Sequence, residues 1–303
     1  MITVFGATGT TGAPLVEALL AKGAKVRAVT SNPAKAEGLA ARGCEVSVGA
    51  YADRVALERA CAGAERIYLV TPAHRDMRRW KANAIDAAKA AGVRHVVLAT
   101  GLGASPKARL TFGMWHSETQ ELLKESGLAW TFVQPTYFMQ NLLWHAESIA
   151  RDGVYHDDLG GPVAWIDARD IAHVAAEALT DEGHEGKAYG LTGPEALTGD
   201  DIAALLSEAT GRTVTCAPLP PDRAKAGMIA NGMHPDVAAA MVELVSIAPK
   251  GYLAGIETTV SEVLGRPGAA SATSWPRTGM PSPDEAAPAP LYLELAPPPG
   301  APA

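Results

Sequence analysis

The chain has 303 residues, of which 48% are hydrophobic and 19% charged, and its formal net charge is −7. This balance is typical of a folded globular protein rather than a disordered or fibrous one, and the acidic excess argues against a nucleic acid as partner. No apolar run approaches the roughly 20 residues of a bilayer-spanning helix, so we expect no membrane segment.

Short β-branched runs alternate with alanine- and leucine-rich stretches through the first 135 residues, which is the signature of repeated βαβ units. The predicted strands are Ile2–Phe5, Lys25–Val29, Glu45–Val48, Arg66–Val70, His95–Thr100 and Trp130–Gln134. The predicted helices are Ala13–Lys22, Ala34–Arg42, Val55–Ala62, Met77–Ala91 and His116–Ser126. Several strands are apolar without alternation, as in a parallel sheet covered on both faces. The predicted fold class is therefore α/β, a Rossmann-type doubly wound parallel sheet in residues 1–135.

A glycine follows each of these five predicted helices. The glycines are Gly23, Gly43, Gly63, Gly92 and Gly127. Glycine suits the left-handed position that closes a helix. The agreement of five local signals with the βα pattern supports the placement of all five helices.

The turn between the first strand and the first helix reads GATGTTG. Its three glycines make a tight turn, let the backbone approach a pyrophosphate and let helix and strand pack closely. The helix N-terminus then faces the phosphates. The predicted cofactor-binding residues here are Gly6, Thr8, Gly9, Thr10, Thr11 and Gly12, joined at the ends of the fourth and fifth strands by Thr71 and Thr100.

The end of the second strand indicates which nicotinamide cofactor is bound. NAD-binding domains place Asp or Glu there to accept the ribose 2′-hydroxyl, but no carboxylate lies between Arg27 and Lys35. Ser31 and Asn32 can hydrogen-bond a 2′-phosphate, and Lys35 can offer it a positive charge. We therefore expect NADP(H) to be favoured over NAD(H). An exposed lysine in a first helical turn is the alternative interpretation of Lys35.

From residue 136 to 265 the pattern changes, and we expect a smaller α+β substrate or partner region interwoven with the first. Its opening segment, TYFMQNLL, follows the last predicted parallel strand and should lie over the cofactor crevice. The candidate substrate-binding residues are Tyr137, Phe138, Met139 and Asn141. A purely structural core role is the alternative for this aromatic and Met-rich cluster.

Two features of the second half concern structure rather than chemistry. Asp167 and Asp170 flank the start of the helix IAHVAAEAL, and we predict that both cap it. Residues 266–303 are dominated by Pro, Ala, Gly and Ser. We predict that they form a disordered tail, dispensable for folding and cofactor binding.

The remaining polar patterns suggest no further site. The basic stretch Arg75–Lys81 is interpreted as the solvated first turns of a helix. Cys44, Cys61 and Cys216 show no spacing typical of metal binding or of a disulfide framework, so we expect no metal and a reducing environment. Because a strand begins at residue 2, no signal peptide is expected. A cytoplasmic protein, with homodimerisation left open, is the resulting expectation.

Several segments together carry a resemblance to a known family. In chain order they are GATGTTG, SNPAKA, NAIDAAKAAGVRHVVLAT, HSETQELL, QPTYFMQNLL and IDARDIAHVAAEAL. From Ile2 to Leu264 the chain resembles the NmrA-like branch of the atypical short-chain dehydrogenases/reductases, nearest to the bacterial NAD(P)H:quinone oxidoreductase type. It departs from many relatives at Ala50, where they carry an aspartate beside the adenine.

Most short-chain dehydrogenases use a Tyr-x-x-x-Lys pair as proton carrier, and this chain lacks it. Phe112 and His116 stand at the corresponding positions. The absence argues against alcohol dehydrogenation, epimerisation and dehydration, each of which needs a positioned proton carrier. The resemblance makes His116 the candidate catalytic residue, as an imidazole titrating near neutrality. An exposed histidine in a helix first turn is the alternative.

Two functions follow as expectations. The first is an NAD(P)H-dependent oxidoreductase that passes hydride to a quinone or a similar small electrophile, because reduction of a quinone yields a stabilised oxyanion that needs little acid help. The second is a non-catalytic NADP(H) sensor that acts through a protein partner. Both use the glycine turn, so the turn does not distinguish them.

Overall fold

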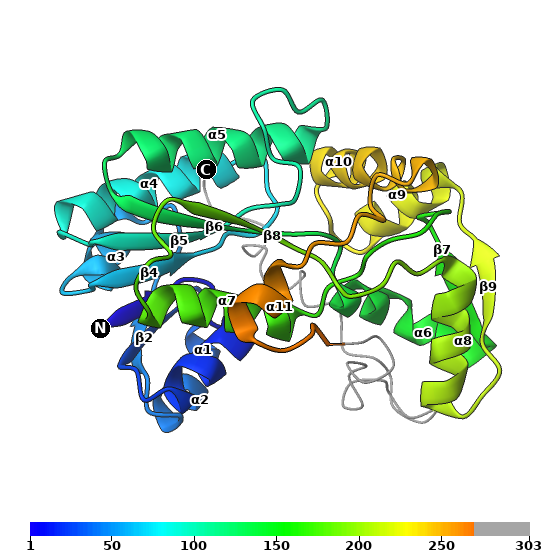
Figure 1. Ribbon diagram of the computed structural model, residues 1–303, viewed down its shortest axis with the longest axis horizontal. Coiled ribbons are helices and arrows are strands. Elements are labelled where there is room, and N and C mark those ends of the chain that lie inside the picture. Colours follow the sequence, from blue (N-terminus) through cyan, green and yellow to red (C-terminus); the bar gives the residue numbers. More distant parts are fainter. Residues whose placement is uncertain (270–303) are drawn as a thin grey trace.

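The computed structural model describes residues 1–269, which form a larger lobe built on a sheet and a smaller lobe beside it (Figure 1). The sheet has seven strands in the order β3-β2-β1-β4-β5-β6-β8, and every neighbouring pair is parallel. The strands are β1 (Ile2–Val4), β2 (Val26–Thr30), β3 (Glu45–Val48), β4 (Arg66–Leu69), β5 (His95–Ala99), β6 (Ala129–Pro135) and β8 (Lys187–Leu191). The predicted α/β Rossmann-type fold class is confirmed.

Helices cover both faces of the sheet because successive strand residues point to opposite sides. The helices of this lobe are α1 (Gly12–Ala21), α2 (Ala36–Ala41), α3 (Arg54–Cys61), α4 (Met77–Ala90), α5 (Thr111–Glu125), α7 (Ala168–Thr180) and α11 (Thr259–Leu264). In β5, Val97 packs into the core beneath α1 and α7, whereas Val96 and Leu98 pack beneath α3, α4 and α5. This two-sided burial explains why the strands are apolar without alternation.

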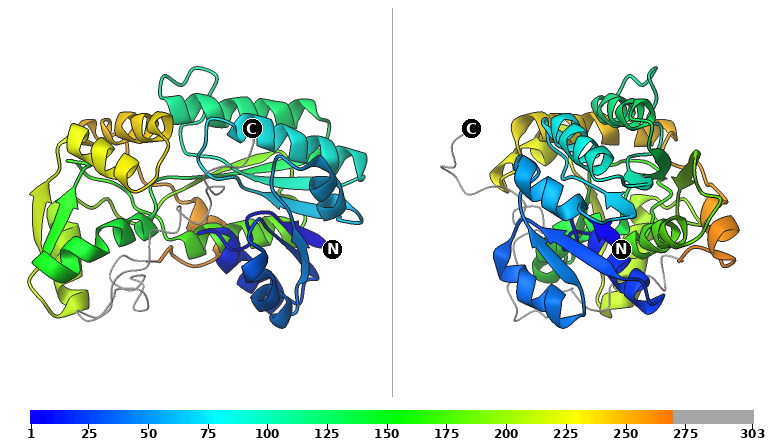
Figure 2. Two further views of the ribbon diagram at one scale, coloured as in Figure 1. Left: turned by 180° about the vertical axis from the view of Figure 1, so that it is seen from behind. Right: turned by 90° about the vertical axis from the view of Figure 1, so that its left-hand side faces the viewer.

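The smaller lobe has its own apolar core, and the chain enters it twice. Its elements are η2 (Met139–His145), α6 (Ala146–Asp152), β7 (Val154–Asp157), α8 (Gly199–Thr210), β9 (Thr215–Pro218), α9 (Pro221–Ala230), α10 (Pro235–Val245) and η3 (Ala248–Lys250). Between the two visits the chain returns to the sheet lobe as α7 and β8, an exchange also visible from behind in Figure 2. Within residues 1–269, no helix has both the length and the apolar character needed to cross a bilayer.

The predicted helix-closing glycines are confirmed, and the start of one helix differs from its prediction. All five glycines after the predicted helices have positive φ, from 67° at Gly63 to 88° at Gly43. The exception is α5, which begins at Thr111 rather than at His116. Gly113 disfavours a helix by propensity, but a Cβ there would lie only 2.8 Å from that of Ala108. Close packing of the preceding loop therefore accounts for a glycine inside this helix.

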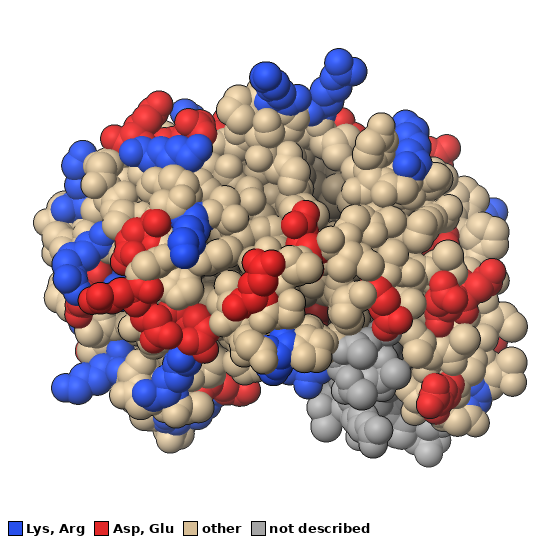
Figure 3. All heavy atoms as spheres, in the orientation of Figure 1, with Lys and Arg blue, Asp and Glu red and all other residues tan. Residues whose placement is uncertain are grey.

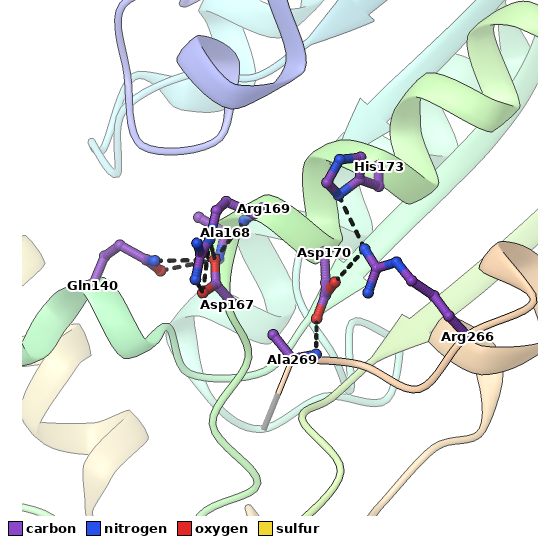
Figure 4. A network of polar contacts seen from close by, with 8 residues as sticks. All are labelled: Gln140, Asp167, Ala168, Arg169, Asp170, His173, Arg266 and Ala269. Carbon is purple, nitrogen blue, oxygen red and sulfur yellow. Dashed lines mark hydrogen bonds and ion pairs between the residues drawn. The ribbon is translucent and has the colours of Figure 1, made fainter. Parts of the chain in front are cut away.

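The two aspartates at the start of α7 have different roles (Figure 4). Asp167 is the N-cap as predicted, because its carboxylate accepts the backbone N–H of Arg169 at 2.7 Å. The capping prediction is wrong for Asp170. Its buried carboxylate accepts from Nη2 of Arg266 at 3.0 Å and from the backbone N–H of Ala269 at 2.6 Å. Residues 266–269 of the predicted tail are thus held against α7, and the rest of that tail lies outside the described residues.

Removing this attachment should destabilise the protein. A chain that ends after residue 264 leaves the Asp170 carboxylate buried without its two donors, so its free energy of unfolding should be about 1–3 kcal/mol lower than that of a chain ending after residue 269. Urea unfolding of the two truncated proteins, followed by circular dichroism, measures the difference. Equal stability would contradict a structural role for residues 266–269.

Candidate active site

The turn after β1 is shaped by its own backbone. Gly6 has φ +63°, and a Cβ on Gly12 would lie 2.0 Å from the carbonyl oxygen of Gly6, which excludes any side chain there. At Gly9 a Cβ would meet only that same oxygen, at 3.3 Å. The fold therefore requires glycine at positions 6 and 12, whereas at position 9 the chain itself would tolerate a small shift. The contacts within the chain therefore do not by themselves demand a glycine at position 9.

The N-terminus of α1 is not neutralised by any side chain. The N-cap residue Thr11 makes no capping hydrogen bond, and no acidic residue lies in the first turn. The Thr11 hydroxyl instead accepts a hydrogen bond from the Tyr68 hydroxyl at 2.9 Å. An uncapped helix N-terminus carries a partial positive charge. Together with the glycine turn, it fits the pyrophosphate of a dinucleotide.

The residues predicted to select the cofactor lie together at the end of β2. Ser31 is exposed, and Asn32 caps the short 3₁₀ helix η1 (Pro33–Lys35) by accepting the N–H of Ala34 at 3.0 Å. Lys35 is the last residue of η1. The turn therefore presents a hydroxyl, an amide and an ammonium group within five residues and contains no carboxylate. This set of groups suits a phosphate better than a neutral hydroxyl.

Some of the buried polar atoms without a partner lie at the carboxyl edge of the sheet. Among the described residues they include Oγ1 of Thr71 after β4, Oγ1 of Thr136 after β6 and Nδ1 of His116 on α5. Such atoms are rare in proteins and call for an explanation. These three lie where a doubly wound fold binds its ligand. Thr100 differs, because its hydroxyl accepts from Gln120 at 3.0 Å and so joins α5 to the sheet.

His116 lies against Gly101, the second residue after β5. A Cβ on Gly101 would be 3.0 Å from Cδ2 and 3.3 Å from Nε2 of the imidazole, so this glycine makes room for the ring. Burial, reinforced by the charge of Lys81, lowers the pKa of His116 to about 3. The prediction that this imidazole titrates near neutrality is therefore wrong. At neutral pH the ring is uncharged, and it can donate a hydrogen bond but does not act as an imidazolium acid.

Lys81 was not recognised from the sequence. Its side chain is only 1% exposed, its Nζ donates to the carbonyl oxygen of Ala99 at 2.8 Å, and burial lowers its pKa to about 7. The interpretation of the basic stretch as wholly solvated is wrong at this position. Lys81 shares helical spacing with the buried residues Met77, Ala84 and Ala88, and that periodicity was the signal in the sequence.

The segment after β6 joins the two lobes. Tyr137 and Met139 belong to the core of the smaller lobe, whereas Phe138 packs against the sheet-lobe core and pairs with Ile166. The Tyr137 ring meets that of Trp165 at a centroid distance of 5.0 Å. Asn141 forms a side-chain hydrogen bond with the Tyr137 hydroxyl, and burial, followed by the charge of Asp158, raises the pKa of that hydroxyl group.

Within residues 1–269, no group of three or more His, Cys, Asp and Glu side chains is arranged to hold a metal ion. On the face shown in Figure 3, Lys, Arg, Asp and Glu side chains are spread over the outer helices, and acidic side chains also lie beside the hollow near the middle of the view.

Comparison with known proteins places this geometry in a family. The NAD(P)H azoreductase of Xenophilus azovorans is 46% identical over 268 residues, covering 88% of this chain and 94% of that protein. Quinone oxidoreductase 2 of Escherichia coli is 32% identical with the same coverage. The crystal structure of the latter with NADPH matches with a TM-score of 0.80 over 90% of this chain and 98% of that one.

A second solved structure shows the same architecture. The Citrobacter sp. triphenylmethane reductase complexed with NADP(H) is 26% identical and matches with a TM-score of 0.78, over 90% of this chain and 98% of that one. The model of the NmrA-like family matches residues 1–264, nearly the whole described chain. The family that the sequence resembled is thereby confirmed: this chain belongs to the NmrA-like family.

Proposed function

We propose that this chain is an NAD(P)H-dependent oxidoreductase that reduces a quinone or a similar small electrophile. The observation that carries the proposal is the carboxyl edge of the sheet, where the uncapped N-terminus of α1 and a neutral His116 flank a row of unpartnered polar atoms. The names of the relatives, an azoreductase, a quinone oxidoreductase and a triphenylmethane reductase, support the same reaction class. All three names describe reductions of conjugated electrophiles.

In this mechanism the chain binds, orients and stabilises charge. The glycine turn and the N-terminus of α1 hold the pyrophosphate, and the bound dinucleotide supplies hydride. His116, held against Gly101, donates a hydrogen bond to the substrate oxygen that gains negative charge. Phe112 offers no hydroxyl, so the site favours substrates whose reduced form is already a stabilised anion. Quinones meet this condition because their reduction restores aromaticity.

NADP(H) is the proposed cofactor of choice. Ser31, Asn32 and Lys35 lie where the ribose 2′-position of the dinucleotide is expected, after β2. The NADPH and NADP(H) bound in the two solved relatives support this choice. Tyr137, Phe138, Met139 and Asn141 remain the proposed wall of the substrate site. Tyr137 and Met139 are nevertheless largely buried in the core of the smaller lobe, so we expect only their edges to meet a substrate.

Exchanging Ser31 for aspartate should reverse the cofactor preference. The new carboxylate repels a 2′-phosphate and accepts a ribose hydroxyl, so the ratio of NADPH to NADH affinity should fall by roughly tenfold or more. Fluorescence titration of both cofactors measures the ratio, with Ser31→Asn as the uncharged control. A native protein that binds NADH more tightly than NADPH would contradict the proposed selectivity.

Removing the imidazole should slow reduction without affecting NADPH affinity. His116→Ala should lower kcat with menadione by about tenfold to a few hundredfold. The ratio of kcat in His116→Ala to kcat in the native protein should stay constant above pH 5, because the native imidazole is already neutral there. Gly101→Ala is a second probe, since its Cβ would displace the ring.

An unchanged rate in His116→Ala would show that the imidazole takes no part in reduction. If the native protein binds NADPH tightly but oxidises it with no quinone, azo or triphenylmethane compound, the chain is a cofactor sensor instead. Stopped assays with that panel of substrates, beside the NADPH titration, separate the two functions.

A further inference from the structure

A column of aromatic rings runs from the glycine turn to the smaller lobe. The rings of this aromatic column belong, in order of contact, to Tyr51, Trp80, His74 and His234. At its first end, the Tyr51 ring lies 6.0 Å from that of Phe5, centroid to centroid. The Tyr51 hydroxyl donates a hydrogen bond to the carbonyl oxygen of Val70 and would lie 3.6 Å from a Cβ on Gly6. Tyr51 therefore lies directly beside the glycine turn.

The middle of the aromatic column lies within the sheet lobe. Trp80 of α4 stacks on Tyr51 with a centroid distance of 6.1 Å and an interplanar angle of 21°. His74, in the segment between β4 and α4, stacks on Trp80 at 4.5 Å and 14°. Aromatic pairs at such separations attract each other, so each ring restricts the position of the next.

The last ring belongs to the smaller lobe. His234 is the N-cap of α10, and its imidazole meets that of His74 edge to face, with a centroid distance of 6.2 Å and an interplanar angle of 62°. The helix itself packs into the core of the smaller lobe through Val237 and Ala238. The contact between the two imidazoles therefore joins the smaller lobe to the column that ends beside the glycine turn.

Each imidazole is oriented by a hydrogen bond from the backbone two residues further on. Nδ1 of His74 accepts the N–H of Asp76 at 3.0 Å, and Nδ1 of His234 accepts the N–H of Asp236 at 3.2 Å. A ring nitrogen that accepts a hydrogen bond carries no proton. The observed edge-to-face contact therefore belongs to the neutral form of both rings.

We propose that His234 is a positioning residue for the dinucleotide. Its contact with His74 keeps the aromatic column in place, and the column holds Tyr51 against the glycine turn. NADPH affinity then depends on the smaller lobe, although His234 itself does not touch the cofactor. The inference rests on the proposed function, because it takes the glycine turn as the cofactor site, and it assigns the smaller lobe a role beyond the substrate wall.

Protonation of the two imidazoles works against this contact, because it converts each Nδ1 from an acceptor into a donor and brings two cations together. The other charged groups that face the two rings are Asp76, Arg75, Arg79 and Asp236. Burial lowers the pKa of His74 below its ordinary value of 6.5, against the charge of Asp76 and together with those of His234 and the two arginines. The stacked arrangement is therefore most stable above pH 6.5 and loses stability as pH falls below that value.

Two substitutions at position 234 separate the ring contact from helix capping. His234→Asn keeps an acceptor that caps α10 but removes the ring, and it should raise the Kd for NADPH by roughly twofold to tenfold, the contribution of one aromatic pair. His234→Phe keeps an aromatic edge without the acceptor and should retain native affinity. Fluorescence titration with NADPH at about pH 8, where imidazoles are neutral, measures both. Native affinity in His234→Asn, or weakened binding in His234→Phe alone, would overturn the proposal.

A matched control removes the cap of another helix in the same lobe. Thr198 is the N-cap of α8 and accepts the backbone N–H of Asp201. Thr198→Ala should lower the stability of the smaller lobe but leave the Kd for NADPH unchanged, because Thr198 is no part of the aromatic column. An increase equal to that of His234→Asn would show that general loosening of the lobe is responsible and overturn the assigned contact.

A double-mutant cycle tests whether the rings act as one unit. Trp80→Leu interrupts the column within the sheet lobe, and His234→Asn removes its far end. The double variant should bind NADPH about as tightly as the weaker of the two single variants, since either change already breaks the column. Effects on Kd that multiply would mean that the two residues act separately, and would overturn the proposal. His74→Asn, which keeps the acceptor for Asp76, replaces Trp80→Leu if that variant does not fold.

The pH dependence of NADPH affinity is a readout that a merely structural role does not move. His74→Phe keeps a stacked ring without a titrating nitrogen. The ratio of the native Kd to that of His74→Phe should rise by roughly twofold to tenfold as pH falls from about 7.5 to about 5.5. Titration of the cofactor phosphate is common to both proteins and cancels in this ratio. A ratio that does not change with pH would show that the His74 ring leaves the column when NADPH is bound, and would overturn the proposal.

These measurements distinguish failure of the inference from failure of the proposed function. A native protein that binds no NADPH would overturn both. If NADPH binds but no quinone, azo or triphenylmethane compound is reduced, the reductase function fails while the affinity differences between the variants still hold. If quinones are reduced and His234→Asn binds NADPH with native affinity, the reductase function stands and the positioning role of His234 falls.

Discussion

The contact between Gly12 and the Gly6 carbonyl oxygen is the constraint on which the rest of the site depends. Any side chain at position 12 would collide with that oxygen, 2.0 Å from an added Cβ. This close approach lets α1 begin directly at the carboxyl edge of the sheet. Its N-terminus is uncapped and has no acidic residue in its first turn. The segments that follow β2, β4, β5 and β6 lie at the same edge of the sheet, because these strands are parallel.

The loss of the Tyr-x-x-x-Lys pair changes the chemistry but not the fold. Phe112 and His116 stand in its place, so a neutral imidazole lies beside the end of β5. The buried ammonium group of Lys81 donates a hydrogen bond to the carbonyl oxygen of Ala99, the last residue of β5. Such an arrangement stabilises a developing anion more readily than it transfers a proton.

Much of the sheet lobe could be predicted from the sequence because its signals are local. The strands, the helix-closing glycines and the glycine turn each depend on a few neighbouring residues, and the structure agrees with them. Predictions failed where packing between segments, rather than a local sequence signal, decides the outcome. The start of α5 depends on Gly113 packing against Ala108, and the role of Asp170 depends on Arg266, far along the chain.

The candidate site divides in the same way. The glycine turn and the polar residues after β2 were predicted from their spacing, whereas the lowered pKa of His116 results from its burial in the folded chain.

Titration of a Gly9→Val protein with NADPH tests the central claim most directly, because position 9 is restricted less by the fold than by the dinucleotide. The account predicts that the variant folds with a near-native melting temperature and that its NADPH affinity falls by roughly tenfold to a hundredfold or more. Native affinity in the folded variant would contradict the assignment of the glycine turn as the cofactor site.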